Sequence, residues 1–238
     1  MASPEESLLE QQKAYYRARA EEYDEWFYRR GRYDRGPENN ARWLAEAAEV
    51  ERDLERFAPR GDVLELACGS GIWTLHLARH ASSLTAVDSS PEMLALNRAR
   101  LGDAPVRYVQ ADIFEWRPDR AYDVVFFSFW HSHVPPECFE PFWGLVRACL
   151  KQGGRAYLVD SLHSETSTAR DHLFEDPEAT TSVRRLNDGR EYRIVKVFLR
   201  PEQLARRLQP LGWQPHFAAT ANYFVYGWAA PRNAGDSA

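Results

Sequence analysis

From Gly61 onward, short apolar runs alternate with segments of helical periodicity, and this alternation restricts the fold more than any other feature of the chain. The apolar runs cover residues 62–67, 83–88, 106–112, 122–129 and 155–161, and helical patterns cover 72–79, 91–101 and 138–150. Strands that alternate with helices predict βαβ units, in which parallel strands form one sheet with helices on its faces. The glycine pair at 153–154 is expected to close the last of these helices.

Segments of different character flank this alternating region. Two helical patterns precede it, at 7–28 and 38–57, and Gly36-Pro37 separates them. After it, Asn187-Asp188-Gly189 stands between two strand-like runs within 180–199, which is a strong signal for a β-hairpin. A short helix at 201–208 precedes two β-rich pieces, 213–219 and 222–230, and the brief turn between these pieces predicts that they pair antiparallel.

Charge and cysteine content argue against several classes of function. The formal net charge of −5 arises from interspersed acidic and basic residues, so we expect no nucleic-acid partner. Cys68, Cys138 and Cys149 are scattered without C-x-x-C spacing, so we expect neither a disulfide framework nor a metal site. The first residues are acidic and polar, and no run approaches the roughly 18 apolar residues that span a bilayer. We therefore expect a cytoplasmic protein that does not associate with membranes.

Three acidic side chains lie at the carboxyl ends of successive predicted strands. Glu65 lies near the end of the first strand, Asp88 at the end of the second and Asp112 at the end of the third. Because ligands bind at this edge of an open parallel sheet, we expect the three carboxylates to line one site. A fixed negative charge at the mouth of the first turn would repel a pyrophosphate, so Glu65 favours a cationic ligand.

The glycines after the first strand are consistent with a ligand other than a dinucleotide. Gly69 and Gly71 allow a close approach of the backbone, but Thr74 stands where the third glycine of G-x-G-x-x-G would lie. The chain also lacks the Gly-Lys-Ser/Thr of a phosphate-binding P-loop. A carboxylate such as Asp88 can accept both hydroxyls of a ribose, and Asp112 can accept an exocyclic amine. S-adenosylmethionine, with its sulfonium, ammonium, ribose diol and adenine amine, meets all of these demands.

Four stretches in order, "VLELACGSG", "VDSSPEML", "QADIFEW" and "YDVVFFSFWHSHVP", resemble successive motifs of the class I S-adenosylmethionine-dependent methyltransferases. The resemblance is close over residues 62–160 and looser elsewhere. It implies an α/β, Rossmann-like, doubly wound sheet of seven mostly parallel strands with an antiparallel last strand, together with an N-terminal helical lid and the inserted hairpin. The domain limits are then 1–60 for the cap, 61–230 for the methyltransferase domain and 231–238 for a disordered tail.

The resemblance also implies roles for individual residues around the cofactor. The family pattern identifies residues that would contact each part of the cofactor and residues that would form the lid. These are Glu65, Ala67, Gly69, Gly71 and Ser128 for the methionine part, Asp88 for the ribose, Met93, Asp112 and Ile113 for the adenine, Tyr15, Tyr16 and Arg19 for the lid, and Ser89 as a further cofactor-binding residue.

Candidate catalytic and substrate residues are less well defined by the pattern. His131 and His133 follow the fourth strand, where a general base could act, although a role in the structure of the turn is also open. Aromatic side chains could form either a substrate cage or core. The arginines of the hairpin could form a solvated edge or hold an acidic substrate. The substrate pocket is expected to include Tyr23, Trp26, Trp130, Arg193 and Tyr223, and the other hairpin arginines are Arg184, Arg185 and Arg190.

The function predicted from these features is transfer of a methyl group from S-adenosylmethionine to O, N, S or a carboxylate of a small molecule by direct in-line displacement. Two alternatives remain open: a nicotinamide-dependent oxidoreductase, and a protein that binds S-adenosylmethionine without catalysis. The sequence leaves the methyl acceptor and the oligomeric state undetermined.

Overall fold

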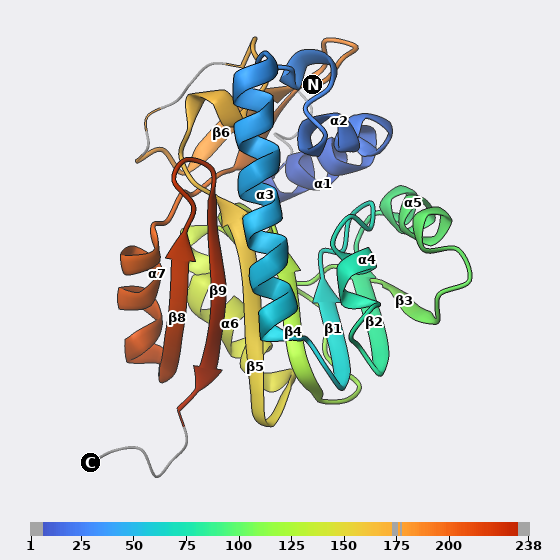
Figure 1. Ribbon diagram of the computed structural model, residues 1–238, viewed down its shortest axis with the longest axis vertical. Coiled ribbons are helices and arrows are strands. Elements are labelled where there is room, and N and C mark those ends of the chain that lie inside the picture. The colour runs from blue at the N-terminus through green and yellow to red at the C-terminus, as the bar shows by residue number, and fades with distance from the viewer. Residues whose placement is uncertain (1–6, 173–175, 177, 233–238) are drawn as a thin grey trace, which may run out of the picture.

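The computed structural model describes residues 7–172, 176 and 178–232 of the chain. Within them a seven-stranded sheet has the order β3-β2-β1-β4-β5-β9-β8 (Figure 1). Neighbours from β3 to β5 pair parallel, whereas β9 runs antiparallel to both β5 and β8, which confirms the predicted sheet. The strands are β1 (Asp62–Leu66), β2 (Ser83–Asp88), β3 (Val106–Gln110), β4 (Tyr122–Ser128), β5 (Leu150–Ser161), β8 (Trp213–Ala219) and β9 (Phe224–Pro231).

Helices cover both faces of the sheet because its central strands are apolar on both sides. Val124 and Phe126 of β4 belong to one buried cluster, and Val125 and Phe127 belong to the other. The first cluster is completed by α3 (Pro37–Phe57) and α4 (Thr74–Leu77), and the second by α6 (Phe139–Ala148) and α7 (Pro201–Leu208). Helix α5 (Pro91–Leu101) has the predicted bounds, with Ser90 capping its first turn and Gly102 following its end.

The long helix α3 packs on the sheet, although the sequence grouped it with the lid. Its stripe of Trp43, Ala47, Val50, Leu54 and Phe57 is buried in the cluster that contains β4 and β9. The buried Glu46 carboxylate accepts hydrogen bonds from four donors of the turn between β8 and β9, which fixes the helix to that turn. Within the predicted cap, it is therefore the described residues before α3 that extend over the carboxyl edge of the sheet.

The N-terminal elements and the hairpin together cover that edge. Helix α1 (Leu8–Ala18), a 3-10 turn (Ala20–Glu22) and α2 (Tyr23–Phe27) replace the single predicted helix. The predicted hairpin is confirmed as β6 (Thr181–Arg185) and β7 (Glu191–Val195), where Gly189 adopts φ +90°. Helix α1 packs against β7, and these elements lie at one end of the molecule (Figure 1).

Several predicted boundaries differ from the observed ones. Gly153 and Gly154 lie inside β5 instead of closing α6, and the register of β5 against β4 shifts at this point. The helix after β1 is shorter than predicted, since residues 74–77 of the expected 72–79 are helical. Of the predicted disordered tail, residues 233–238 lie outside the described residues, and Pro231 still belongs to β9. None of the described helices is both long and apolar enough to cross a bilayer.

Candidate functional site

The loop after β1 is braced by the acid at the end of β2. Asp88 Oδ2 accepts the backbone N–H of Gly69 at 2.9 Å, and Asp88 Oδ1 accepts the N–H of Ser90 at 2.9 Å. The loop turns through Ala67 and Gly69, which both adopt positive φ values near 50°. Parallel pairing of β1 with β2 places the two strand ends side by side, so one carboxylate fixes the loop and the start of α5 together.

A pocket of about 700 Å³ opens beside this loop and unites most of the predicted cofactor residues. Its walls come from α1, the ends of β1, β2 and β4, the start of α5 and the segment after β3. Nine of the thirteen residues predicted around the cofactor line it: Tyr16, Ala67, Gly69, Asp88, Ser89, Met93, Asp112, Ile113 and Ser128. Trp130, predicted for the substrate pocket, also lines this one.

Glu65 and Gly71 are not among the lining residues of this pocket. Glu65 is 1% exposed, and neither of its carboxylate oxygens has a hydrogen-bond partner within the described residues. Burial raises the pKa of Glu65 to about 8, a shift that the Thr74 hydroxyl opposes without reaching hydrogen-bond geometry. At Gly71, a Cβ atom would lie 2.8 Å from the Asn97 side chain, so this glycine allows α5 to approach the loop.

Lys13 is a pocket residue that the sequence did not indicate. Its Nζ lies 2.7 Å from Asp112 Oδ2, while Asp112 Oδ1 accepts the N–H of Phe114 at 3.0 Å. This ion pair joins α1 to the end of β3 across the pocket. A single lysine on an amphipathic helix carries no signal of such a contact, because the pairing exists only after α1 is placed over the sheet.

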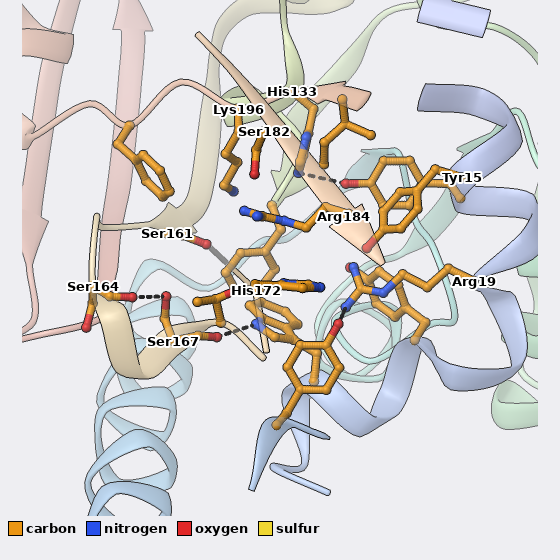
Figure 2. A pocket seen from close by; sticks show the side chains of 18 of the residues that line it. Tyr15, Arg19, His133, Ser161, Ser164, Ser167, His172, Ser182, Arg184 and Lys196 are labelled. Atoms are coloured by element: carbon orange, nitrogen blue, oxygen red, sulfur yellow. Dashed lines mark hydrogen bonds between the residues drawn. The ribbon is translucent and has the colours of Figure 1, made fainter. Parts of the chain in front are cut away.

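A second pocket of about 780 Å³ lies between the N-terminal elements, the loop after β5 and the hairpin (Figure 2). Arg19, Tyr23 and Trp26 line it, and Arg19 belongs to this pocket instead of the first. Many other polar side chains, most of which the sequence did not indicate, share its walls. They include Tyr15, Tyr33, Ser161, His163, Ser164, Ser167, Thr168, His172, Ser182, Arg184 and Lys196.

Lys196 follows β7 and lies buried at this second pocket. Its Nζ donates to Ser132 Oγ at 2.7 Å and lies 3.9 Å from Asp160 Oδ1. Burial lowers the pKa of Lys196 to about 8, and although Asp160 opposes this shift, the positive charges of Arg184 and Arg19 add to it. The second pocket is therefore electropositive.

The two predicted catalytic histidines lie in different surroundings. His133 lines the second pocket; its Nδ1 lies 2.7 Å from the Val195 carbonyl, which can only accept a hydrogen bond. Nδ1 must therefore carry the proton, so Nε2 accepts the hydroxyl of Tyr16 at 2.7 Å. Burial and then Lys196 hold the pKa of His133 well below its usual value, so the ring stays neutral.

His131, the other predicted catalytic histidine, lines neither of these two pockets. It is 6% exposed, packs against Phe139 and Phe142, and its Nε2 accepts the indole N–H of Trp143 at 3.3 Å. Burial lowers the pKa of His131 to about 4. The chain turns by one 3-10 turn after β4, and this turn directs His131 into the core and His133 toward the pocket.

Two further residues predicted for the substrate pocket also lie outside it. Arg193 is exposed on β7, on the face of the hairpin opposite to Ile194. Tyr223 is 1% exposed, and its hydroxyl pairs with the Thr166 hydroxyl at 3.0 Å behind the pocket. Strand parity and the position of the β8–β9 turn decide these orientations, and neither is visible in a local sequence pattern.

The two pockets meet at a shared wall. Tyr16, Tyr23 and Phe129 line both of them. Phe129, the first residue after β4, has a φ of +50° while its N–H donates to the Val159 carbonyl at 2.7 Å. A positive φ is uncommon for a bulky residue, and such strained conformations concentrate at functional sites. The two pockets are therefore adjacent, with these three side chains at their common boundary.

Comparisons with known proteins connect this arrangement to a family. Residues 63–154 match a family model described as a methyltransferase domain. The structure of the DhpI-SAH complex superposes with a TM-score of 0.77 at 39% identity over 94% of this chain and 97% of that one. The DhpI-SAM-HEP complex gives the same TM-score and identity over 96% of this chain and 100% of that one.

Curated relatives match over shorter stretches. Trans-aconitate 2-methyltransferase of Escherichia coli O139:H28 (strain E24377A / ETEC) is 38% identical over 93 residues, which are 38% of this chain and 36% of that protein. Malonyl-[acyl-carrier protein] O-methyltransferase of Anoxybacillus flavithermus (strain DSM 21510 / WK1) is 42% identical over 69 residues, which are 28% of this chain and 27% of that protein. The matched stretches therefore span about a third or less of these relatives.

Proposed function

Because the chain belongs to the class I S-adenosylmethionine-dependent methyltransferases, we propose that it transfers a methyl group from S-adenosylmethionine to a small molecule held in the second pocket. The observation that carries the proposal is the wall of Tyr16, Tyr23 and Phe129, where the two pockets meet. A methyl donor in the first pocket and an acceptor in the second would contact each other there, as in-line transfer requires.

The residues of the first pocket suit the cofactor. Asp88 and Ser89 are proposed to hold the ribose, and Met93, Asp112 and Ile113 the adenine. The buried carboxylate of Glu65 has no donor among the described residues, and such an orphaned acceptor is costly unless a ligand supplies one. When bound, the cofactor supplies an activated methyl group on a sulfonium, whose bonding electron pair returns to sulfur as the new bond forms.

The proposed acceptor is a small molecule because the second pocket is roofed by chain elements. Trp26 Nε1 and Arg29 both donate to the Ser167 carbonyl, so α2 is tied to the loop after β5. On the other side, Gln12 Nε2 donates to the His133 carbonyl while Gln12 Oε1 accepts the N–H of Val195. The curated relatives are named for trans-aconitate and for malonyl-[acyl-carrier protein], and these names describe the relatives' own substrates.

The chain's contribution to transfer is proposed to be positioning and exclusion of water. The neutral His133 accepts from Tyr16, and the buried Tyr16 keeps its proton because burial raises its pKa well above the usual value. His133 is therefore assigned to orient Tyr16 at the wall between the pockets, in place of the general base that the sequence predicted. The cytoplasmic location stays a prediction.

Calorimetric titration with S-adenosylhomocysteine, run beside NADH, tests the cofactor assignment. We expect micromolar binding of S-adenosylhomocysteine and no binding of NADH, because Thr74 stands where the dinucleotide motif G-x-G-x-x-G has its third glycine. A transfer assay with labelled S-adenosylmethionine and a panel of small acceptors then separates an enzyme from a protein that only binds the cofactor. Binding of NADH alone would restore the oxidoreductase alternative.

Glu65 predicts that cofactor binding releases protons. With a pKa of about 8, its carboxyl group is mostly protonated in the ligand-free protein at pH 7. A bound cation nearby favours the carboxylate and lowers that pKa, so up to about one proton should leave when S-adenosylmethionine binds. Titrations at pH 7 in buffers of different ionisation enthalpy measure this number, and Glu65→Gln should abolish the release. Equal release from the Glu65→Gln protein would contradict the assignment.

A further inference from the structure

We propose that the acceptor carries an oxyanion, a carboxylate or a phosphate group, and that Ser182, Arg184 and Lys196 of the hairpin region bind it. The inference rests on the proposed function in assigning the acceptor to the second pocket. Figure 2 shows the three side chains on one side of this pocket, with Arg19 entering from the other.

The parity of the hairpin directs these groups into the pocket. Ser182 and Arg184 are two residues apart on β6, so their side chains lie on the same face, and both line the pocket. Register pairs Ser182 with Ile194, which also lines the pocket and precedes Lys196 by two residues. On β6 the alternate residues face outward: Val183 is 38% exposed, and Arg185 forms an ion pair with Glu191.

Ser182 supplies a hydrogen-bond group without a partner. Ser182 is only 3% exposed, and its Oγ has no hydrogen-bond partner within the described residues. A buried hydroxyl in this state carries a desolvation penalty of about 1–3 kcal/mol that a ligand oxygen would relieve. The same pocket therefore contains both a free donor and positive charge.

The positive charges at this pocket are poorly neutralised. Apart from Lys196, no described lining cation has a carboxylate within salt-bridge distance, and no described lining residue is Asp or Glu. Asp160, the acid beside Lys196, lies 3.9 Å from its Nζ and already accepts the N–H groups of Ser132 and Ser161. Like charges gathered in a partly dehydrated pocket repel one another, and a bound anion would attract each of them and offset this repulsion.

Arg19 strengthens the field from the opposite wall. Its guanidinium carbon lies 5.0 Å from the ring centroid of Tyr23, 5.5 Å from that of Tyr15 and 5.6 Å from that of Tyr33. The Tyr33 hydroxyl is a hydrogen-bond partner, but Arg19 Nε has none among the described residues. Aromatic faces stabilise this cation without cancelling its charge.

His172, one of the histidines that line this pocket, adds no charge at neutral pH. His172 Nδ1 pairs with the Thr168 hydroxyl at 2.9 Å, and its Nε2 accepts the N–H of Arg185 at 3.3 Å. Burial, with Arg184 second, lowers the pKa of His172 to about 3. The positive charge assigned to anion recognition is therefore that of the arginine and lysine side chains, and not that of His172 or His133.

The test is a titration of the protein, with and without saturating S-adenosylhomocysteine, with malonate, inorganic phosphate and the uncharged analogue malonamide. We expect at least one anion to bind and malonamide not to bind. Arg184→Gln should weaken anion binding by at least about tenfold, the loss expected for a charged hydrogen bond. Arg185→Gln removes the same charge from the neighbouring position on the outward face and should leave binding unchanged.

The arms separate the possible outcomes. Binding of malonate alone assigns a carboxylate, binding of phosphate alone assigns a phosphate group, and both outcomes support the proposal. Equal anion affinity in the Arg184→Gln and unsubstituted proteins, or preference for malonamide, overturns it. Lys196→Met is the second variant if Arg184→Gln does not fold by circular dichroism. Anion binding without any binding of S-adenosylhomocysteine would refute the proposed function alone, and the reverse would refute only this inference.

Discussion

Replacing Asp88 by alanine is expected to weaken the binding of S-adenosylhomocysteine by roughly 10- to 150-fold. Loss of a hydrogen bond to a charged acceptor corresponds to about 1.5–3 kcal/mol, which gives this range. The structure adds a second reason for a large effect, because the same carboxylate holds the N–H groups of Gly69 and Ser90. The variant therefore loses both a proposed ribose contact and the brace of the loop after β1.

Calorimetry on three variants measures this effect and separates its two sources. Asp88→Asn keeps one oxygen for a backbone N–H and should fall between Asp88→Ala and the unsubstituted protein. Asp103→Ala removes an exposed acid of the segment after α5 and serves as the charge-matched control. Thermal unfolding of each variant shows whether the loop has lost stability. Unchanged affinity in Asp88→Ala would remove this residue from the cofactor site.

Replacing Lys196 by methionine is expected to stabilise the ligand-free protein while it weakens anion binding at least tenfold. Burial, reinforced by Arg184 and Arg19 and only partly offset by Asp160, depresses the pKa of Lys196 to about 8. A buried charge of this kind can often be replaced by an apolar side chain with a gain in stability. The lost hydrogen bond to Ser132 Oγ offsets part of the gain, which leaves a net effect on the order of 1 kcal/mol at pH 7.

The pH dependence of this effect has a definite sign. The pKa of Lys196 is lower in the folded protein than its usual 10.5, so between about pH 8 and 10.5 the unfolded chain binds more protons. The free energy of unfolding of the unsubstituted protein therefore increases as pH rises through that window and Lys196 loses its proton. Below about pH 8, the full cost of burying the charged ammonium group is present. The advantage of Lys196→Met should be largest at pH 7 and small near pH 10.

Urea unfolding of both proteins at these two pH values measures the difference directly. The other groups that face the ammonium, Asp160, Arg184, Arg19 and the neutral His133, are common to both proteins, so their own titration largely cancels. A Lys196→Met protein that is less stable at pH 7, with a difference that does not change with pH, would contradict the conclusion that burial destabilises the charged form of Lys196.

The sequence by itself determined the sheet, its order of elements and the first pocket. Apolar runs alternating with helices leave few arrangements, and parallel strands bring their carboxyl ends to one edge. Because Asp88 ends β2 and Asp112 lies two residues beyond the end of β3, the pairing of these strands brings both acids into the same pocket. The hairpin was also predictable from a local pattern, since Asn187-Asp188-Gly189 supplies the turn and Gly189 adopts a positive φ there.

Tertiary structure alone decided the second pocket, because each of its features depends on the direction of a side chain and not on its identity. The sequence named four hairpin arginines and assigned Arg193 to the substrate pocket, but the fold turns Arg184 inward and Arg193 outward, and a register shift of one residue would place both on the same face. One 3-10 turn sends His131 into the core and His133 to Tyr16. Lys196 gained its surroundings only when the hairpin folded over Ser132 and Asp160, which are 64 and 36 positions away in the chain. Contacts of that separation are fixed by packing of the whole chain, which no local pattern records.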